Sequence, residues 1–232
     1  MSDYIILTDS SCDLPAELAE ELGLEVLPLA FVIDGHTYRN LLDGSEIGFH
    51  DYYDLLRAGK TGSTSAVNIG AFLEAMRPQL EAGKDLLYLG FSSGLSATFS
   101  AGATAAEQLR EEFPERKVYA VDTLCASLGQ GLLVWHAVQQ QRQGKSIEEV
   151  RDFVEENKLH LCHWFTVDDL MHLKRGGRIS SSTALLGSAL NIKPVMHMDN
   201  EGLLKPVDKE RGRKKALKAL ADRLRDTAIG AA

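Results

Sequence analysis

The chain has 232 residues, of which 44% are hydrophobic and 25% are charged, the composition of a globular protein with a substantial core. Its net charge of -8 argues against a general nucleic-acid binder. No apolar run approaches the roughly 20 residues that span a bilayer, and the first residues, Met1 to Asp9, lack a signal-peptide pattern. We therefore expect no integral membrane segment and no secretion signal.

The three cysteines, Cys12, Cys125 and Cys162, are odd in number and far apart in the sequence. They form neither a C-x-x-C pair nor a disulfide framework, which favours a reduced, cytoplasmic protein with cysteines as small packing residues. No set of His, Cys and carboxylate residues has metal-ligand spacing, because His160 and Cys162 share a strand face without further ligands. We expect no metal and no cofactor.

In chain order, apolar runs predict strands at 5–7, 24–33, 86–89, 117–121, 161–167 and 192–198. Turn signals at Asp34-Gly35 and at 199–202 predict return strands at 36–39 and 203–207. Helical patterns follow Pro15, Ser45 and Ser146, the last two as caps. Further helices are predicted at 69–80, 95–112, 127–141, 168–174, 182–190 and from 209 onward, with a loop at 61–65.

Strands and helices alternate along most of the chain, which predicts an α/β fold with a largely parallel sheet. Because a hairpin follows in the second half, we expect two α/β subdomains, residues 1–160 and residues 161–232.

Hydroxyl residues recur where predicted strands pass into helices. The clusters are Asp9-Ser10-Ser11, Ser63-Thr64-Ser65, Ser92-Ser93, and Asp122-Thr123 with Ser127. Ligands of open α/β sheets bind at the carboxyl ends of strands, and helix N-termini there offer free N–H groups. The repetition predicts a site for an anionic head group, either a carboxylate or a phosphate, although each hydroxyl taken alone is equally typical of a helix cap.

Gly90-Phe91-Ser92-Ser93-Gly94 also matches the G-x-S-x-G pattern of a nucleophile elbow. A serine hydrolase using Ser92 is therefore the alternative function. It would need an acid such as Asp122 and a histidine, His172 or His197, and the HGGG-type oxyanion segment is absent. Nucleotide-binding glycine motifs are also absent.

Positive charge gathers in the second half of the chain. Lys174-Arg175-Gly176-Gly177-Arg178 places cations around a glycine pair, and residues 203–225 hold nine Lys or Arg against three acids. The pattern is typical of a solvated helix face, and it also suits a docking surface for an acidic partner.

Seven stretches read together resemble one family. They are ILTDSSCDLP (6–15), STSAVNIGAF (63–72), GFSSGLSATFSAG (90–102), VDTLCASLGQGLLV (121–134), LKRGGRIS (173–180), LNIKPVMHMDNEG (190–202) and RGRKKALKAL (211–220). In this order they resemble the DegV family of bacterial fatty-acid-binding proteins. Members of that family continue well beyond the RGRKKA stretch, so the resemblance implies that the 161–232 subdomain is incomplete.

The resemblance implies a carrier without chemistry of its own and without a cofactor, with one long-chain fatty acid held between two α/β subdomains. A separate fatty acid kinase would phosphorylate the carboxylate for phospholipid synthesis. The resemblance assigns Thr64, Ser65, Ser92 and Ser93 to the carboxylate. It assigns Arg175, Arg178, Arg211 and Arg213 to kinase docking. Phe72–Met76 and Ala184–Leu190 are candidate walls for the acyl tail.

Overall fold

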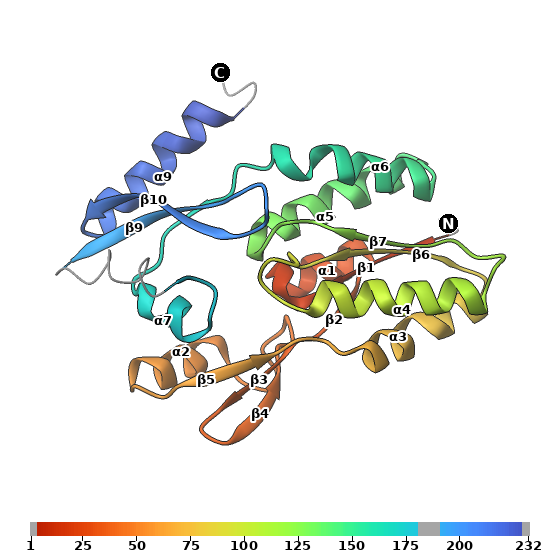
Figure 1. The fold of residues 1–232 in the computed structure, drawn as a ribbon, viewed down its shortest axis with the longest axis horizontal. Helices are drawn as coiled ribbons and strands as arrows, with labels where there is room; N and C mark the ends of the chain where they lie inside the picture. Colours follow the sequence, from red (N-terminus) through yellow and green to blue (C-terminus); the bar gives the residue numbers. More distant parts are fainter. Residues whose placement is uncertain (1–3, 181–190, 229–232) are drawn as a thin grey trace. The chain divides into compact units, whose positions relative to one another are not determined.

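The computed structural model describes residues 4–180 and 191–228, so the predicted helix at 182–190 lies outside the described residues. The chain divides into two compact units, Met1–Lys158 and Leu159–Ala232, and each is described by itself (Figure 1).

The first unit is built on a four-stranded parallel sheet with the strand order β2-β1-β6-β7. The strands are β1 (Tyr4–Asp9), β2 (Glu25–Leu27), β6 (Asp85–Gly90) and β7 (Val118–Asp122). Leu86 and Tyr88 of β6 pack into a core cluster with Phe72 and Met76. Leu87 and Leu89 alternate with them and are equally buried, so both faces of the sheet are covered, as the continuous apolar run predicts.

Helices cover both faces of this sheet. α3 (Ile69–Glu81) and α4 (Thr98–Glu112) lie on one face, and α5 (Ser127–Arg142) and α6 (Ile147–Asn157) lie on the other (Figure 1). A 3-10 turn η1 (Ser10–Cys12) and α1 (Ala16–Leu22) follow β1.

A second, antiparallel sheet in the same unit corrects two predictions. The run 24–33 is two strands, β2 and β3 (Ala30–Ile33), in different sheets, separated by Pro28, which has no N–H to donate. The predicted loop at 61–65 contains β5 (Gly62–Ser65), which pairs with β3, as does β4 (His36–Arg39) across the predicted Asp34-Gly35 turn. Both turn residues have positive φ, 53° and 79°.

Helix starts were predicted with mixed success. The predicted Ser45 cap is wrong: α2 (Phe49–Arg57) begins after Gly48, and the Ser45 N–H donates to Asp43 Oδ1 at 2.9 Å ahead of the helix. The Ser146 cap of α6 is confirmed: Ser146 Oγ accepts the Glu149 N–H, and the Glu149 carboxylate accepts the Ser146 N–H.

The second unit holds an antiparallel sheet with the order β10-β9-β8. Its elements are η2 (Lys158–His160, bridging from the first unit), β8 (Trp164–Phe165), α7 (Leu170–Arg175), β9 (Ile192–Met198), β10 (Leu204–Arg211) and α9 (Arg213–Thr227). The α/β class is confirmed, with the parallel sheet in the first unit and antiparallel sheets beside it and in the second.

Candidate functional site

Polar residues meet at the carboxyl edge of the parallel sheet. β1 ends at Asp9, β7 ends at Asp122, and β6, which lies between them, leads into Ser92 and Ser93. Parallel neighbouring strands end at one edge, so three of the four predicted hydroxyl clusters are close together.

The fourth cluster, around Thr64, reaches this edge through the segment that follows β5. The Val67 N–H donates to Thr98 Oγ1 at 3.3 Å, and Thr98 Oγ1 lies 2.9 Å from Ser96 Oγ. These contacts join the end of the Thr64 segment to the start of α4, immediately after the Ser92–Ser93 loop.

Thr64 and Ser65 are both exposed, but they belong to opposite faces of their sheet. Thr64 pairs with Phe31 and Ser65 pairs with Ala30 on β3, and successive side chains of a strand alternate between faces. The two hydroxyls therefore cannot both face the same carboxylate. Thr64 lies on the same face of the sheet as the aromatic side chain of Phe31.

The backbone N–H groups of the loop after β6 all donate to acceptors within the protein. The acceptors for residues 91 to 96 are, in order, Asp9 Oδ2, Cys125 O, the Asp122 carboxylate, Ser92 Oγ, Ser92 O and Ser92 O. These N–H groups therefore already have acceptors within the protein. A ligand here would be met by side-chain hydroxyls.

Ser92 is fully buried, and its Oγ accepts the Gly94 N–H at 3.3 Å. A nucleophile elbow exposes its serine and uses the N–H of the next residue for the oxyanion. Here that next N–H, of Ser93, points to the Asp122 carboxylate at 3.3 Å. Both observations speak against the serine hydrolase alternative, whereas Ser93 is exposed and suits a ligand contact.

Asp9 is a fully buried carboxyl group at this edge. Tyr88 Oη donates to Asp9 Oδ2 at 2.9 Å, and the Ser11 N–H donates to Oδ1 at 3.1 Å. Burial raises the pKa of Asp9, and the hydrogen bonds from Phe91, Tyr88 and Ser11 oppose that rise. Burial and the neighbouring Asp9 raise the pKa of Tyr88, so the phenol remains a donor. Sequence reasoning assigned Asp9 only to a hydroxyl cluster and did not predict this role.

Two of the cysteines match the predicted packing role. Burial raises the pKa of Cys12 to about 11 and that of Cys125 to about 12, so neither is a thiolate nucleophile at neutral pH. Cys162 is exposed, which corrects its interpretation as a packing residue. Within residues 4–180 and 191–228, no three His, Cys, Asp or Glu side chains gather as a metal site requires.

Two of the four predicted docking arginines, Arg175 and Arg213, lie near one pair of acids in the second unit. Lys193 and Arg213 reach the Asp168 carboxylate at 3.1 and 3.6 Å, and Arg175 lies 4.0 Å from Asp169. Arg178 follows the end of α7, where its N–H bonds to Leu173 O and Gly177, with φ of 77°, reverses the chain.

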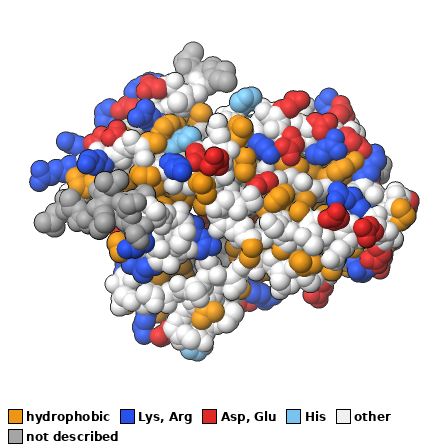
Figure 2. Space-filling view, viewed as in Figure 1, with side chains coloured by type: hydrophobic (Ala, Val, Ile, Leu, Met, Phe, Trp, Pro, Cys, Tyr) orange, Lys and Arg blue, Asp and Glu red, His pale blue; other side chains and the backbone are white. Residues whose placement is uncertain are grey.

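Arg211 is exposed at the last position of β10, two residues before Arg213. Figure 2 shows Lys and Arg side chains gathered over the part of the second unit that carries β9, β10 and α9.

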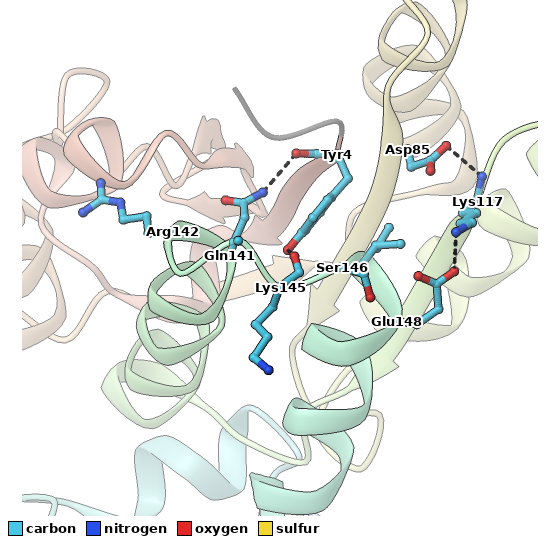
Figure 3. Close-up of a pocket in the computed structure, with 10 residues that line it drawn as sticks. Tyr4, Asp85, Lys117, Gln141, Arg142, Lys145, Ser146 and Glu148 are labelled. Carbon is cyan, nitrogen blue, oxygen red and sulfur yellow. Dashed lines mark hydrogen bonds and ion pairs between the residues drawn. The ribbon is translucent and has the colours of Figure 1, made fainter.

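A pocket of about 760 Å³ lies at the opposite, amino-terminal edge of the parallel sheet (Figure 3). Its lining includes Tyr4, Asp85, Lys117, Lys145 and Glu148, and Lys117 pairs with Glu148 at 2.6 Å. None of the predicted site residues lines it. Its charged, internally paired wall does not suit an acyl tail.

Of the two candidate walls for the acyl tail, the structure describes Phe72–Met76. Phe72 and Met76 are fully buried in the core of the parallel sheet, where Phe72 packs edge-on against Tyr88 at 4.8 Å, so they fill the core instead of lining an open tunnel. Ala184–Leu190 lies outside the described residues. No helix in the described part of the chain is both long and apolar enough to cross a membrane.

The fold is that of an α/β protein whose parallel sheet carries polar side chains along its carboxyl edge. Comparison with known proteins identifies its family. Residues 4–231 match the family described as "Uncharacterised protein, DegV family", and the chain belongs to the DegV family.

Relatives support this membership over nearly the whole chain. A DegV domain-containing protein of Clostridium perfringens is 46% identical over 224 residues, which is 97% of this chain and 77% of that protein. Two solved DegV structures also match. The Thermus thermophilus protein, described as fatty-acid binding, has 35% identity and a TM-score of 0.84, with 99% of this chain and 79% of that one covered. The Bacillus subtilis protein, described as a fatty acid binding protein, has 32% identity and a TM-score of 0.80, with 97% and 78% covered.

Proposed function

We propose that this chain binds one long-chain fatty acid and carries it without chemistry of its own. The observation that carries the proposal is the likeness to the Thermus thermophilus protein, which is described as fatty-acid binding and matches 99% of this chain at 35% identity. The hydroxyl-lined sheet edge supplies the kind of head-group site that such a ligand needs.

The proposed carboxylate donors are the hydroxyls of Thr64 and Ser93. Both side chains are exposed, and the contact between Val67 and Thr98 connects their segments. Ser65 lies on the other face of its sheet, and Ser92 is buried in the loop, so these two are the weaker members of the predicted set.

Hydroxyl donors suit a carboxylate that must react later. Burying an unpaired carboxylate is costly, so it needs hydrogen bonds or a place near water. Hydroxyls satisfy its oxygens without neutralising its charge, whereas a lysine would hold it tightly and lower its nucleophilicity. Burial of the tail supplies the affinity: about fourteen CH₂ groups at about 0.8 kcal/mol each give about 11 kcal/mol before the costs of association.

We further propose that a fatty acid kinase is the partner and that Arg175, Arg178, Arg211 and Arg213 form its docking surface. The shared neighbourhood of Arg175 and Arg213 around Asp168 and Asp169 supports one continuous basic surface on the second unit. An acidic face on the kinase would complement it. A protein that presents an acyl chain to this enzyme in the cytoplasm fits the family's proposed place in phospholipid synthesis.

The test is to load the purified protein with a labelled long-chain fatty acid and measure the dissociation constant. The double variant Thr64→Ala with Ser93→Ala removes both proposed donors and is expected to weaken binding by at least about tenfold, since hydrogen bonds to a charged group are strong. The control is Thr37→Ala with Ser100→Ala, two exposed hydroxyls outside the predicted clusters. Equal affinity of the two double variants would move the head-group site elsewhere.

A further inference from the structure

The loop Phe91–Gly94, which carries Ser93, is held by a carboxylate on each side. Asp9, at the end of β1, accepts the Phe91 N–H at 2.9 Å. Asp122, at the end of β7, accepts the Ser93 N–H at 3.3 and 3.4 Å from its two oxygens. Because β1 and β7 flank β6 in the sheet, the loop is tied to both neighbouring strands.

The Asp9 side of this arrangement is built deep in the core. Buried carboxylates persist only where donors surround them, and Asp9 receives Tyr88 Oη as well as the backbone N–H groups of Phe91 and Ser11. Room for Tyr88 comes from two glycines: a Cβ at Gly90 would lie 2.7 Å from Tyr88 Oη, and one at Gly102 would overlap the Tyr88 ring. The first glycine of the G-x-S-x-G pattern thus serves this hydrogen bond.

The Asp122 side fixes the loop nearer to solvent. Asp122 Oδ1 also accepts the Leu124 N–H at 3.0 Å, and the Asp122 backbone oxygen accepts Lys158 Nζ at 3.1 Å. These two contacts hold Asp122 in place. Asp122 in turn fixes the position of the Ser93 backbone.

We infer that Asp9 and Asp122 are positioning residues of the fatty-acid head-group site. They occupy the backbone N–H groups of the loop and fix its course, so that the exposed Ser93 hydroxyl is the group offered to the ligand. The two carboxylates act through Ser93 and do not touch the ligand. This inference rests on the proposed function and adds which residues orient its head-group donor.

The experiment compares the affinity for a long-chain fatty acid with that for the fatty alcohol of the same length. Both ligands bury the same tail, so their affinity ratio isolates head-group recognition from tail binding and from folding. The variants are Asp122→Ala, Asp122→Asn and Tyr88→Phe, the last of which weakens the hold on Asp9 without emptying the core. The matched control is Asp85→Ala, because Asp85 accepts the Lys117 N–H at 3.0 Å at the other end of β6.

The expected result for Asp122→Ala is an acid-to-alcohol affinity ratio lowered by about tenfold, the scale of one charged hydrogen bond lost. Asp122→Asn keeps one acceptor oxygen, so its affinity ratio should lie between those of Asp122→Ala and wild type. The ratio of Tyr88→Phe should also lie between them. Asp85→Ala should have the wild-type ratio. If Asp122→Ala does not fold, the other two variants decide.

Unchanged ratios in folded Asp122→Asn and Tyr88→Phe would overturn the inference. An equal loss of affinity for both ligands would also overturn it, since that is the mark of a purely structural role. If wild type and variants prefer the acid to the same degree, the inference about Asp9 and Asp122 fails, but the proposed function stands. A wild-type protein that binds neither ligand would overturn both.

Discussion

At the scale of single residues, the strand-end region depends on small side chains that leave room for a large one. Tyr88 is fully buried, and its ring packs against Phe72 and lies beside the backbone of Gly102 on α4. The sequence predicts that β6 is buried, because its run is continuously apolar. It does not predict that a tyrosine inside the run reaches Asp9, because that contact joins residues 79 positions apart.

Gly102→Ala tests this packing. An alanine in a helix interior ordinarily adds about 1 kcal/mol of stability over glycine. Here the new Cβ would lie 2.8 Å from Tyr88 Cδ1 and 3.0 Å from Phe72 Cε1, and overpacking of this kind costs about 1–3 kcal/mol. We expect the clash to prevail and the free energy of unfolding in urea to fall. Ser100→Ala, exposed on the same helix, is the control, and a more stable Gly102→Ala would contradict the packing described here.

At the scale of elements, the sequence correctly predicted a cap and a turn that are formed by residues close together in the chain. The Ser146–Glu149 cap and the Asp34-Gly35 turn each lie within four residues, and both are confirmed. β5 was missed because Gly-Ser-Thr-Ser has the composition of a loop and becomes a strand only by pairing with β3. That pairing places the Thr64 and Ser65 side chains on opposite faces of the sheet. The sequence could therefore suggest both hydroxyls but could not tell which one faces a ligand.

The cap of α6 gives a prediction with a pH dependence. The Ser146 N–H, and then Lys145, lower the pKa of Glu149. A lowered folded-state pKa stabilises the fold above the unfolded-state pKa, and that contribution is lost as the pH falls through the folded-state value. Glu149→Gln should therefore be less stable than wild type at neutral pH, and the gap should close in acid.

The measurement is thermal unfolding across the acidic range, with Glu156→Gln, exposed on the same helix, as the control. Ser146→Ala, which removes the other half of the cap, should cost about 1 kcal/mol. A Glu149→Gln deficit that stays constant with pH would show that the carboxylate charge is not what stabilises the cap.

At the scale of the whole molecule, charge is divided unevenly: residues 203–225 carry an excess of cations in a chain whose net charge is -8. All four proposed docking arginines belong to the second unit, whereas the proposed carboxylate donors belong to the first. Docking and ligand retention should therefore be separable by mutation.

Arg211→Glu with Arg213→Glu should lower kcat/KM of the fatty acid kinase for the loaded protein by about tenfold, with an effect that shrinks as salt is added. Retention of the fatty acid should not change. Lys218→Glu with Arg225→Glu, two cations of α9 that pair with Asp222 at 2.6 and 2.5 Å, is the charge-matched control. An equal loss in the control would indicate a general charge effect and not a docking surface.

The central claim, that this member of the DegV family carries a fatty acid, is tested most directly by its contents. The protein is purified, denatured and extracted, and the extract is analysed by mass spectrometry. We predict one long-chain fatty acid per chain, exchangeable with added fatty acid. A protein that releases no fatty acid and cannot be loaded with one would contradict the account.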